Sequence, residues 1–267
     1  MNNILIIGYG VVGQNIGHEL IKAGLKFDVH DPMQDRLAED RTYRYAFVCV
    51  PTNACPDGSC DTSIVEDVIR TFSATRRAQT FIIKSTIPPG TTHEIISANR
   101  HDSIVFSPEY YGGTLHANTP HPFQIIGADS LRVVNEVAEL YKRMYTGYAR
   151  LYIVPSATAE LIKYAENTWL AMQVTFFNQF GRIAEELGLS IDQFREGLLL
   201  DERISRSHSF VYRDHPFYDS HCLNKDVPAL IAFCKKKAMD TSFIQNIIDT
   251  NERFKIDTYF GRENYAQ

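Results

Sequence analysis

The sequence of 267 residues contains few cysteines, one tryptophan and no apolar run long enough to cross a membrane. A membrane-spanning helix needs about 20 mostly apolar residues in succession, so no membrane partner is expected. The first residues, Met1 to Ile7, lack the charged start and long apolar stretch of a signal peptide. Five cysteines in a chain of this length do not indicate a disulfide framework. These absences together predict a cytoplasmic protein.

An excess of positive charge is also missing, because the formal net charge is −5. This charge gives no electrostatic footprint for nucleic acid, and no nucleic-acid partner is expected. Cys55 and Cys60 flank four residues and lack a second pair of ligands, so no metal site is expected there. The length allows one large domain or two modest ones.

A glycine-rich motif follows the first apolar segment. Residues 3–7 are typical of a buried parallel strand, and a helical pattern then continues to Gly24. The motif between them is Gly8, Tyr9, Gly10, Val11, Val12 and Gly13. Glycines in this context allow a tight turn and the close approach of a pyrophosphate to the helix N-terminus, whose dipole favours an anion. The stretch therefore predicts a dinucleotide-binding turn.

A second strand, 27–31, ends in an acidic residue. Asp31 lies 18 residues after Gly13, close to the spacing of an acid that binds the adenine ribose. Asp28 is the less suitable ligand because it falls inside the strand. A carboxylate at Asp31 repels a 2′-phosphate, so the expected cofactor is NAD rather than NADP.

Strands and helices then alternate up to about residue 144. The pattern predicts strands at 45–50, 80–83, 104–106 and 123–127, and helices at 61–72, from 91 or 92, and at 130–144. This alternation is typical of a doubly wound parallel sheet that binds its ligands at the carboxyl ends of the strands. Thr52, Thr86 and Glu109 each follow such an end.

The longest element predicted is a helix over 156–187, roughly 45 Å long at 1.5 Å per residue. Apolar residues recur every three or four positions and predict one buried face: Ile162, Ala165, Trp169, Met172, Phe176, Phe180, Ile183 and Leu187. Ser156 or Thr158 is expected to cap its start and Gly188 to end it. Lys163 and Asn167, four residues apart, share one side of the helix. They form either a solvated polar face or a site that holds a developing oxyanion.

The remainder of the sequence is helical in pattern. Ser190 begins a capping box for a short helix, and residues 201–224 are irregular. Asp226 is expected to cap a helix through Lys237, and a last helix runs from 240 or 241 to about 259. The predicted fold class is therefore α/β, with a Rossmann-type doubly wound parallel sheet over 1–154 and an all-helical domain over 155–267, built on the long helix.

Seven stretches together resemble the UDP-glucose/GDP-mannose dehydrogenase family. They are GYGVVG, VCVPTNACPDGSCDTSIVEDV, KSTIPPGTT, FSPEYY, TAELIKYAENTWLA, LDERI and HCLNKDVPAL, and they occur in family order. The resemblance implies a Rossmann domain, a helical middle that dimerises through the long helix, and a C-terminal domain that grips the nucleotide. It also implies a double oxidation with NAD, in which an alcohol becomes an acid through a cysteine thiohemiacetal and thioester, as in UDP-glucose 6-dehydrogenases of polysaccharide biosynthesis.

The resemblance assigns roles to individual residues. Cys222 matches the nucleophile, which suits a thiol because a thiolate attacks carbonyls well. Lys163 and Asn167 match the pair that stabilises the oxyanion and contacts the substrate. Lys225 is expected near the cofactor and Asp226 near the attacking water.

Further matches concern the loops. Thr86 matches the loop that orders water, and Glu109 matches the acid implicated in thioester hydrolysis and substrate binding. Arg203 matches an arginine that reaches the substrate across the dimer. Cofactor contacts are expected at Val50, Pro51, Thr52, Ser85 and Thr86, and further substrate contacts at Tyr110 and Tyr111.

The sequence departs from the family pattern in four places. The chain ends near where the nucleotide-gripping domain would begin, and bulky residues replace the glycines before Cys222. Gly113 replaces a second acid, and the segment between Asp31 and Tyr45 is short.

Three interpretations follow from these departures. The first is a dehydrogenase of a nucleotide sugar or smaller sugar, in which the homodimer partner supplies the missing walls of the substrate site. The second is a compact β-hydroxyacid-type dehydrogenase with one oxidation, and the third is a non-catalytic NAD-binding dimer.

Overall fold

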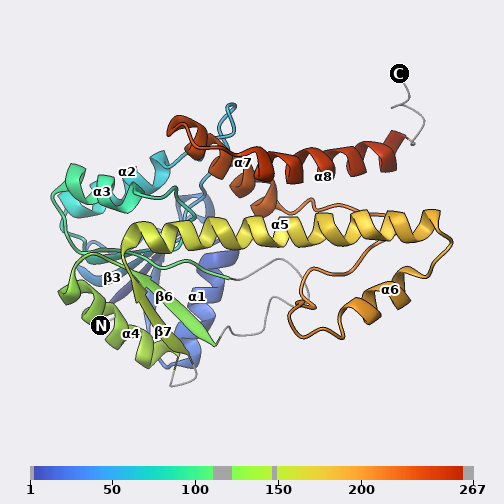
Figure 1. The fold of residues 1–267 in the computed structure, drawn as a ribbon. Helices are drawn as coiled ribbons and strands as arrows, with labels where there is room; N and C mark the ends of the chain where they lie inside the picture. Colours follow the sequence, from blue (N-terminus) through green and yellow to red (C-terminus); the bar gives the residue numbers. More distant parts are fainter. Residues whose placement is uncertain (1–2, 111–121, 146–148, 261–267) are drawn as a thin grey trace. The chain divides into compact units, whose positions relative to one another are not determined.

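The computed structural model describes residues 3–110, 122–145 and 149–260, and the chain divides into two compact units (Figure 1). The first unit comprises the residues up to Asn53 together with Cys60–Lys163, and the second comprises Ala54–Ser59 with the residues from Tyr164 onward. The division falls inside a single long helix, α5 (Ser156–Glu186). The domain boundary that the sequence predicts between residues 154 and 155 stays a prediction.

The first unit is built on a seven-stranded sheet with the strand order β2-β1-β3-β4-β5-β6-β7. Its strands are β1 (Ile4–Ile7), β2 (Phe27–His30), β3 (Tyr43–Val48), β4 (Ala78–Ile83), β5 (Ile104–Phe106), β6 (Phe123–Gly127) and β7 (Arg150–Val154). The first five run parallel, which confirms the Rossmann-type sheet. β6 pairs antiparallel with β5, and β7 parallel with β6, so the last two strands run opposite to the first five.

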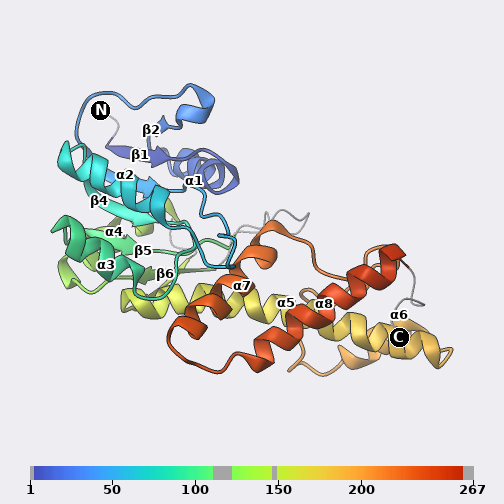
Figure 2. The ribbon, with the colours of Figure 1, turned by 90° about the horizontal axis from the view of Figure 1, so that it is seen from above.

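Helices cover both faces of this sheet. They are α1 (Val11–Lys22), α2 (Ser63–Ala74), α3 (Thr91–Asn99) and α4 (Leu131–Met144), with a short 3-10 helix, η1 (Pro32–Gln34), after β2. One core cluster joins α1 and α4 to the sheet through residues such as Leu20 and Val137. The other joins α2 and α3 through Ile69 and Ile95, and α2 and α3 lie side by side (Figure 2).

The start of α5 packs directly on β6. A Cβ atom at Gly127 would lie 2.4 Å from the Cβ of Ala159, so only glycine at the end of β6 allows the helix to come this close. The start of α5 is capped by Asp129, which accepts hydrogen bonds from the Ser156 backbone N–H (3.2 Å) and hydroxyl (2.7 Å). The predicted side-chain caps Ser156 and Thr158 are therefore corrected: the cap comes from the loop after β6.

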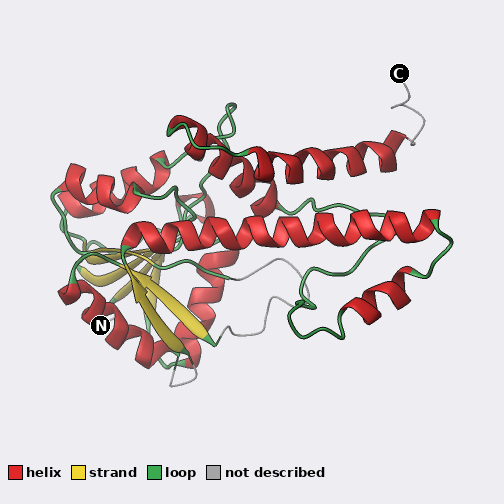
Figure 3. Cartoon of the chain, viewed as in Figure 1, coloured by secondary structure: helices red, strands yellow, loops and turns green. Residues whose placement is uncertain are grey.

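The second unit contains α5 from Tyr164 onward, α6 (Ile191–Leu198), α7 (His221–Lys236) and α8 (Ser242–Phe260) (Figure 3). Its core cluster lies among α5, α7 and α8 and includes Ala171, Val227 and Ile247. Asn251, which is fully buried, donates to the Tyr218 carbonyl and accepts from its N–H, so it ties α8 to the segment before α7. The predicted all-helical character holds for the described residues of this unit.

The apolar stripe predicted to be the buried face of α5 is largely exposed in this chain. Trp169, Phe176, Phe180 and Ile183 leave 53%, 43%, 38% and 42% of their surfaces accessible. The buried side chains of α5 include many small or polar ones: Ala159, Glu160, Lys163, Tyr164, Asn167, Thr168, Ala171, Gln173, Thr175, Phe177, Asn178 and Ala184. Periodicity identifies an apolar stripe, but it does not identify the surface that the stripe covers.

The beginning of α7 also differs from the prediction. The helix begins at His221, where the Ser220 hydroxyl accepts the Leu223 N–H as an N-cap, and Asp226 lies inside the helix with 2% exposure. Pro228 favours a helix start close to it, because proline suits the first helical position. Here the helix accommodates the proline in its second turn. Asp226 is therefore not the cap.

Among the described residues, no helix combines the length and apolar character needed to span a membrane.

Candidate functional site

The turn after β1 has the backbone that its glycines predict. Gly8 has φ +85°, and a Cβ there would lie 2.6 Å from the Cys49 carbonyl oxygen. A Cβ at Gly13 would lie 2.1 Å from the Gly8 carbonyl oxygen, so both positions require glycine. Gly10 differs, because a Cβ there would meet nothing within 4 Å. Gly10 is the N-cap residue of α1, and no side chain at this position accepts a hydrogen bond from the first N–H groups of the helix. An open, uncapped helix N-terminus fits a pyrophosphate.

Asp31 lies next to this turn, as the spacing predicts. Its Oδ2 accepts the Tyr9 backbone N–H at 2.7 Å, and its Oδ1 accepts the Met33 N–H at 3.1 Å. Gln34 bridges the two elements by donating to both the Tyr9 carbonyl and the Asp31 carboxylate. The guanidinium of Arg36 lies 4.8 Å from the centre of the Tyr9 ring. The acid is thus held at the glycine turn, where a dinucleotide would present its ribose.

Other predicted cofactor contacts lie at the carboxyl ends of β3 and β4. Ser85 donates its hydroxyl proton to the Val50 carbonyl at 2.6 Å, with the Val48 carbonyl at 3.3 Å. Thr52 is buried, Pro51 is exposed, and Thr86 is half-buried with its carbonyl 3.6 Å from the Cys60 sulfur. The loops that carry these residues are thus joined by direct hydrogen bonds. This juxtaposition follows from the parallel pairing of β3 and β4.

Glu109, Tyr110 and Lys163 are the remaining predicted residues of the first unit. Glu109 is 9% exposed and Lys163 is 7% exposed, so neither belongs to a solvated polar face. The Lys163 ammonium lies 5.0 Å from the centre of the Tyr110 ring, a cation–π contact. Tyr111 lies outside the described residues.

Glu160 was not predicted as a site residue, yet it organises this region. Its carboxylate is fully buried and accepts the backbone N–H groups of Gly90 (2.5 Å) and Thr92 (2.8 Å), and the Thr92 hydroxyl (2.5 Å). Gly90, with φ +98°, carries no side chain to cap α3, and Glu160 supplies that cap from α5. Burial raises the pKa of Glu160, and the bonds from Gly90 and Thr92 oppose this shift. The loop with Thr86 is thereby joined to the helix turn before Lys163.

Three predicted residues of the second unit form one buried cluster. The Asn167 amide donates to the Asp226 Oδ2 at 2.6 Å, and Lys225 forms an ion pair with the Asp226 Oδ1. Asn167 and Asp226 are 4% and 2% exposed. The α7 carboxylate is therefore fixed to α5 by an amide and neutralised by an ammonium.

Cys222 lies in the first turn of α7 and is exposed. Asp226 follows it four positions later, so both side chains fall on the same side of the helix. A thiol in the first helical turn is close to the positive end of the helix dipole, which stabilises a thiolate. The arrangement can present a nucleophile beside a fixed carboxylate and amide.

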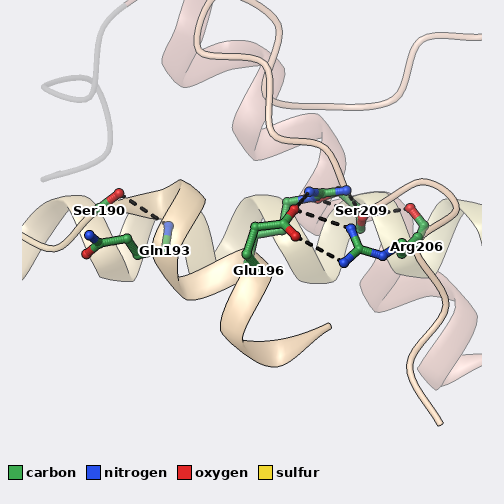
Figure 4. A network of polar contacts seen from close by, with 6 residues as sticks. Ser190, Gln193, Glu196, Arg206 and Ser209 are labelled. Carbon is green, nitrogen blue, oxygen red and sulfur yellow. Dashed lines mark hydrogen bonds and ion pairs between the residues drawn. The ribbon is translucent and has the colours of Figure 1, made fainter. Parts of the chain in front are cut away.

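Arg203 lies on an exposed loop after α6. Arg206 and Ser209, further along the same segment, are bound to α6 (Figure 4). Arg195 is buried and donates through its Nε to the Ser209 carbonyl (3.1 Å) and through its Nη2 to the Ser209 hydroxyl (2.8 Å). Glu196 pairs with Arg206 at 3.0 Å. Arg203 itself is 89% exposed and pairs with Asp201. It is not brought into contact with the other predicted residues within the second unit.

Comparisons with known proteins match two parts of the chain to one family. Residues 21–145 match the NAD binding domain of the UDP-glucose/GDP-mannose dehydrogenase family, and residues 157–253 match its central domain. A UDP-glucose 6-dehydrogenase of Rickettsia bellii is 28% identical over 213 residues, which cover 77% of this chain and 48% of that protein. A putative UDP-glucose 6-dehydrogenase of Bacillus subtilis is 33% identical, over 77% of this chain and 50% of that protein. The chain thus spans about half the length of the curated relatives it matches.

The fold has a similar counterpart among solved structures. A UDP-glucose dehydrogenase from the archaeon Pyrobaculum islandicum superposes with a TM-score of 0.78 at 24% identity, over 95% of this chain and 68% of that one. The two family matches together span more than half of the chain. The match to the NAD binding domain identifies NAD as the cofactor. The chain therefore belongs to the UDP-glucose/GDP-mannose dehydrogenase family.

Proposed function

We propose that the protein is an NAD-dependent dehydrogenase that oxidises the primary alcohol of a nucleotide sugar to the acid through Cys222. The observation that carries the proposal is the cluster on α7 and α5. Cys222 and Asp226 share one side of α7, and Asp226 is fixed by Asn167 and Lys225. A structural cluster needs no exposed thiol one turn away, whereas a covalent mechanism does.

The roles of the side chains follow from their chemistry. Bound NAD+ supplies the hydride acceptor for each oxidation. The Cys222 thiolate adds to the aldehyde carbon, and the Lys163 ammonium and Asn167 amide stabilise the negative oxygen of the resulting thiohemiacetal. Loss of a second hydride leaves a thioester. Glu109 and Asp226 are the carboxylates that can accept a proton from the water that hydrolyses it, which releases the acid and restores the thiol.

The residues around the glycine turn support the binding of the cofactor. The open position at Gly10, the uncapped start of α1 and the carboxylate of Asp31 fit a pyrophosphate and a ribose. Val50, Pro51, Thr52, Ser85, Thr86 and Lys225 are the further proposed contacts. Tyr110 and Arg203 are proposed to bind the substrate.

We infer that the protein acts as a homodimer through α5. The support is the exposed stripe of Trp169, Phe176, Phe180, Ile183 and Leu187, whose large apolar side chains are 38–66% accessible in the single chain. Contiguous apolar surface of this kind marks an interaction site. Arg203, which is exposed and pairs with Asp201 in the single chain, is proposed to contact the substrate bound by the partner subunit.

The test is a screen of UDP- and GDP-sugars for NADH production with the parent protein. We expect one substrate to yield two NADH per sugar. Cys222→Ser should stop the reaction at or before the aldehyde, while Cys234→Ser, a thiol change further along α7, should retain both oxidations. One NADH per turnover that persists in Cys222→Ser would contradict the covalent mechanism. NAD binding without turnover of any sugar would contradict the enzymatic function.

A further inference from the structure

Lys84, at the end of β4, carries an amine that the proposed mechanism leaves without a role. Its side chain is buried, with 2% exposure. The Nζ donates to the Ser107 hydroxyl at 3.2 Å and to the Pro108 carbonyl at 3.5 Å, and it lies 5.4 Å from the centre of the Tyr141 ring. Its partners Ser107 and Pro108 immediately precede Glu109 in the chain.

The bonds around Ser107 fix the direction of this contact. Ser107 is fully buried and gives its single hydroxyl proton to the Ile125 carbonyl at 2.7 Å. Its oxygen can then only accept, and it receives the Tyr141 hydroxyl (2.8 Å) and the Lys84 ammonium. The ammonium is thus part of a network that holds the exit of β5 against β6 and α4.

The charged and titratable groups around Lys84 come from three elements. Cys49 follows β3, Glu109 follows β5 and Tyr141 belongs to α4, while Lys163 lies over the neighbouring Tyr110 ring as a second cation. Burial raises the pKa of Cys49 to about 12, so this thiol is neutral at physiological pH. Glu109 is therefore the group whose negative charge acts on the ammonium. Burial lowers the pKa of Lys84 to about 8, and the negative charge of Glu109 opposes this shift.

Burying an ammonium group destabilises the folded state of a protein. Burial disfavours the charged form, and an apolar side chain of similar size packs without that cost. Positions that carry such a cost are typical of functional sites, where charge placement matters more than stability.

We propose that Lys84 is a positioning residue for Glu109: its buried ammonium fixes the turn that carries this carboxylate and keeps the carboxylate ionised for thioester hydrolysis. The inference rests on the proposed function for the role of Glu109. A carboxylate must be ionised to take a proton from water, and a nearby cation lowers the pKa of that carboxylate.

The first experiment compares the pH–rate profile of acid formation for the parent, Lys84→Met and Lys142→Met. Lys142 is an exposed lysine of α4 and serves as the matched control. We expect Lys84→Met to lower the rate and to move the acid limb of the profile upward by about one pH unit, with KM for NAD unchanged, because Glu109 loses its cation. Lys142→Met should leave the limb in place. A reduced rate with an unmoved limb would assign Lys84 to packing alone and overturn the proposal.

The second experiment needs no turnover. The pKa of the Glu109 carboxyl is measured by carbon NMR in protein labelled at glutamate, and the resonance is assigned with Glu109→Gln. A higher value in Lys84→Met than in the parent supports the proposal, and an equal value overturns it. This measurement does not depend on activity. If the protein oxidises no sugar, the proposed function is contradicted, but the pKa comparison still tests the effect of Lys84 on Glu109.

Discussion

At the scale of single residues, the proposed mechanism uses several polar groups that the fold buries. Lys84, Glu109, Lys163, Asn167 and Asp226 are each less than 10% exposed. The family resemblance assigned roles to the last four, but it assigned nothing to Lys84. The lysine precedes Ser85 and Thr86 in the KST string, and its burial depends on Ser107 and Tyr141, which are distant in the sequence. Proximity of this kind is decided by strand order.

The buried amine of Lys84 predicts a pH dependence of stability. Its pKa is about 8 in the folded protein and 10.5 in the unfolded chain, so the unfolded state binds more protons between these values. The free energy of unfolding should therefore rise with pH across this window, and the cost of the charge should be complete below it. We expect Lys84→Met to raise the Tm at pH 7, with a gain that fades toward pH 10.5. A gain of the same size at both pH values would contradict the buried charge, and Lys142→Met provides the baseline.

Asp31 predicts the choice between the two dinucleotides. In Asp31→Asn the amide oxygen can still accept the Tyr9 N–H, so the glycine turn should keep its shape. The loss of a charge-assisted bond to the ribose should weaken NAD binding about 10-fold, roughly 1.4 kcal/mol, while NADP binding is unchanged or improved. Titration calorimetry with both dinucleotides measures the ratio. Asp35→Asn, a nearby charge change, should leave the ratio of NAD to NADP affinity unaltered. An unchanged ratio in Asp31→Asn would contradict the proposed contact between Asp31 and the ribose.

At the scale of elements, helix ends explain most differences between sequence and structure. The predicted strands are found within about two residues, but β7 was missed although its sequence, Arg-Leu-Tyr-Ile-Val, suits a strand. The caps of α3 and α5 come from Glu160 and Asp129, which lie far from those ends in the sequence. Local signals find a cap only when it is adjacent in the chain, as Ser190 is for α6.

The α3 cap gives a stability prediction. Glu160→Gln leaves one oxygen to accept and places an amide N–H opposite a backbone N–H of Gly90 or Thr92. We expect a loss of about 1.5–3 kcal/mol, because hydrogen bonds to a buried charged group are broken. Chemical denaturation measures the loss. The control is Glu94→Gln, an exposed acid in the first turn of α3, which should cost only a few tenths of a kcal/mol. Equal effects of the two changes would refute the capping role of Glu160.

At the scale of the whole molecule, the exposed stripe of α5 is the feature that one chain leaves unexplained. The rings of Phe176 and Phe180 contact each other in a tilted arrangement with their centres 4.7 Å apart, and Phe180 stacks on Phe194. A stripe of this size favours association of two copies through the helix. Phe176→Asp should yield a soluble monomer or a poorly soluble chain, as measured by light scattering. Asn246→Asp adds the same charge at an exposed position of α8, outside the stripe, and should remain dimeric. A dimeric Phe176→Asp would rule out this interface.

The sequence by itself determined the glycine turn, the acid that follows β2, the alternation of strands and helices, and the length of α5, because each of these depends on residues close together in the chain. Only the tertiary structure decided that Asn167 holds Asp226, that Glu160 caps α3, that Lys84 binds Ser107 and Pro108 just before Glu109, and that the apolar stripe of α5 is exposed in the single chain. These contacts join segments from different elements. Their formation depends on strand order and helix packing, which the spacing of residues along the chain does not encode.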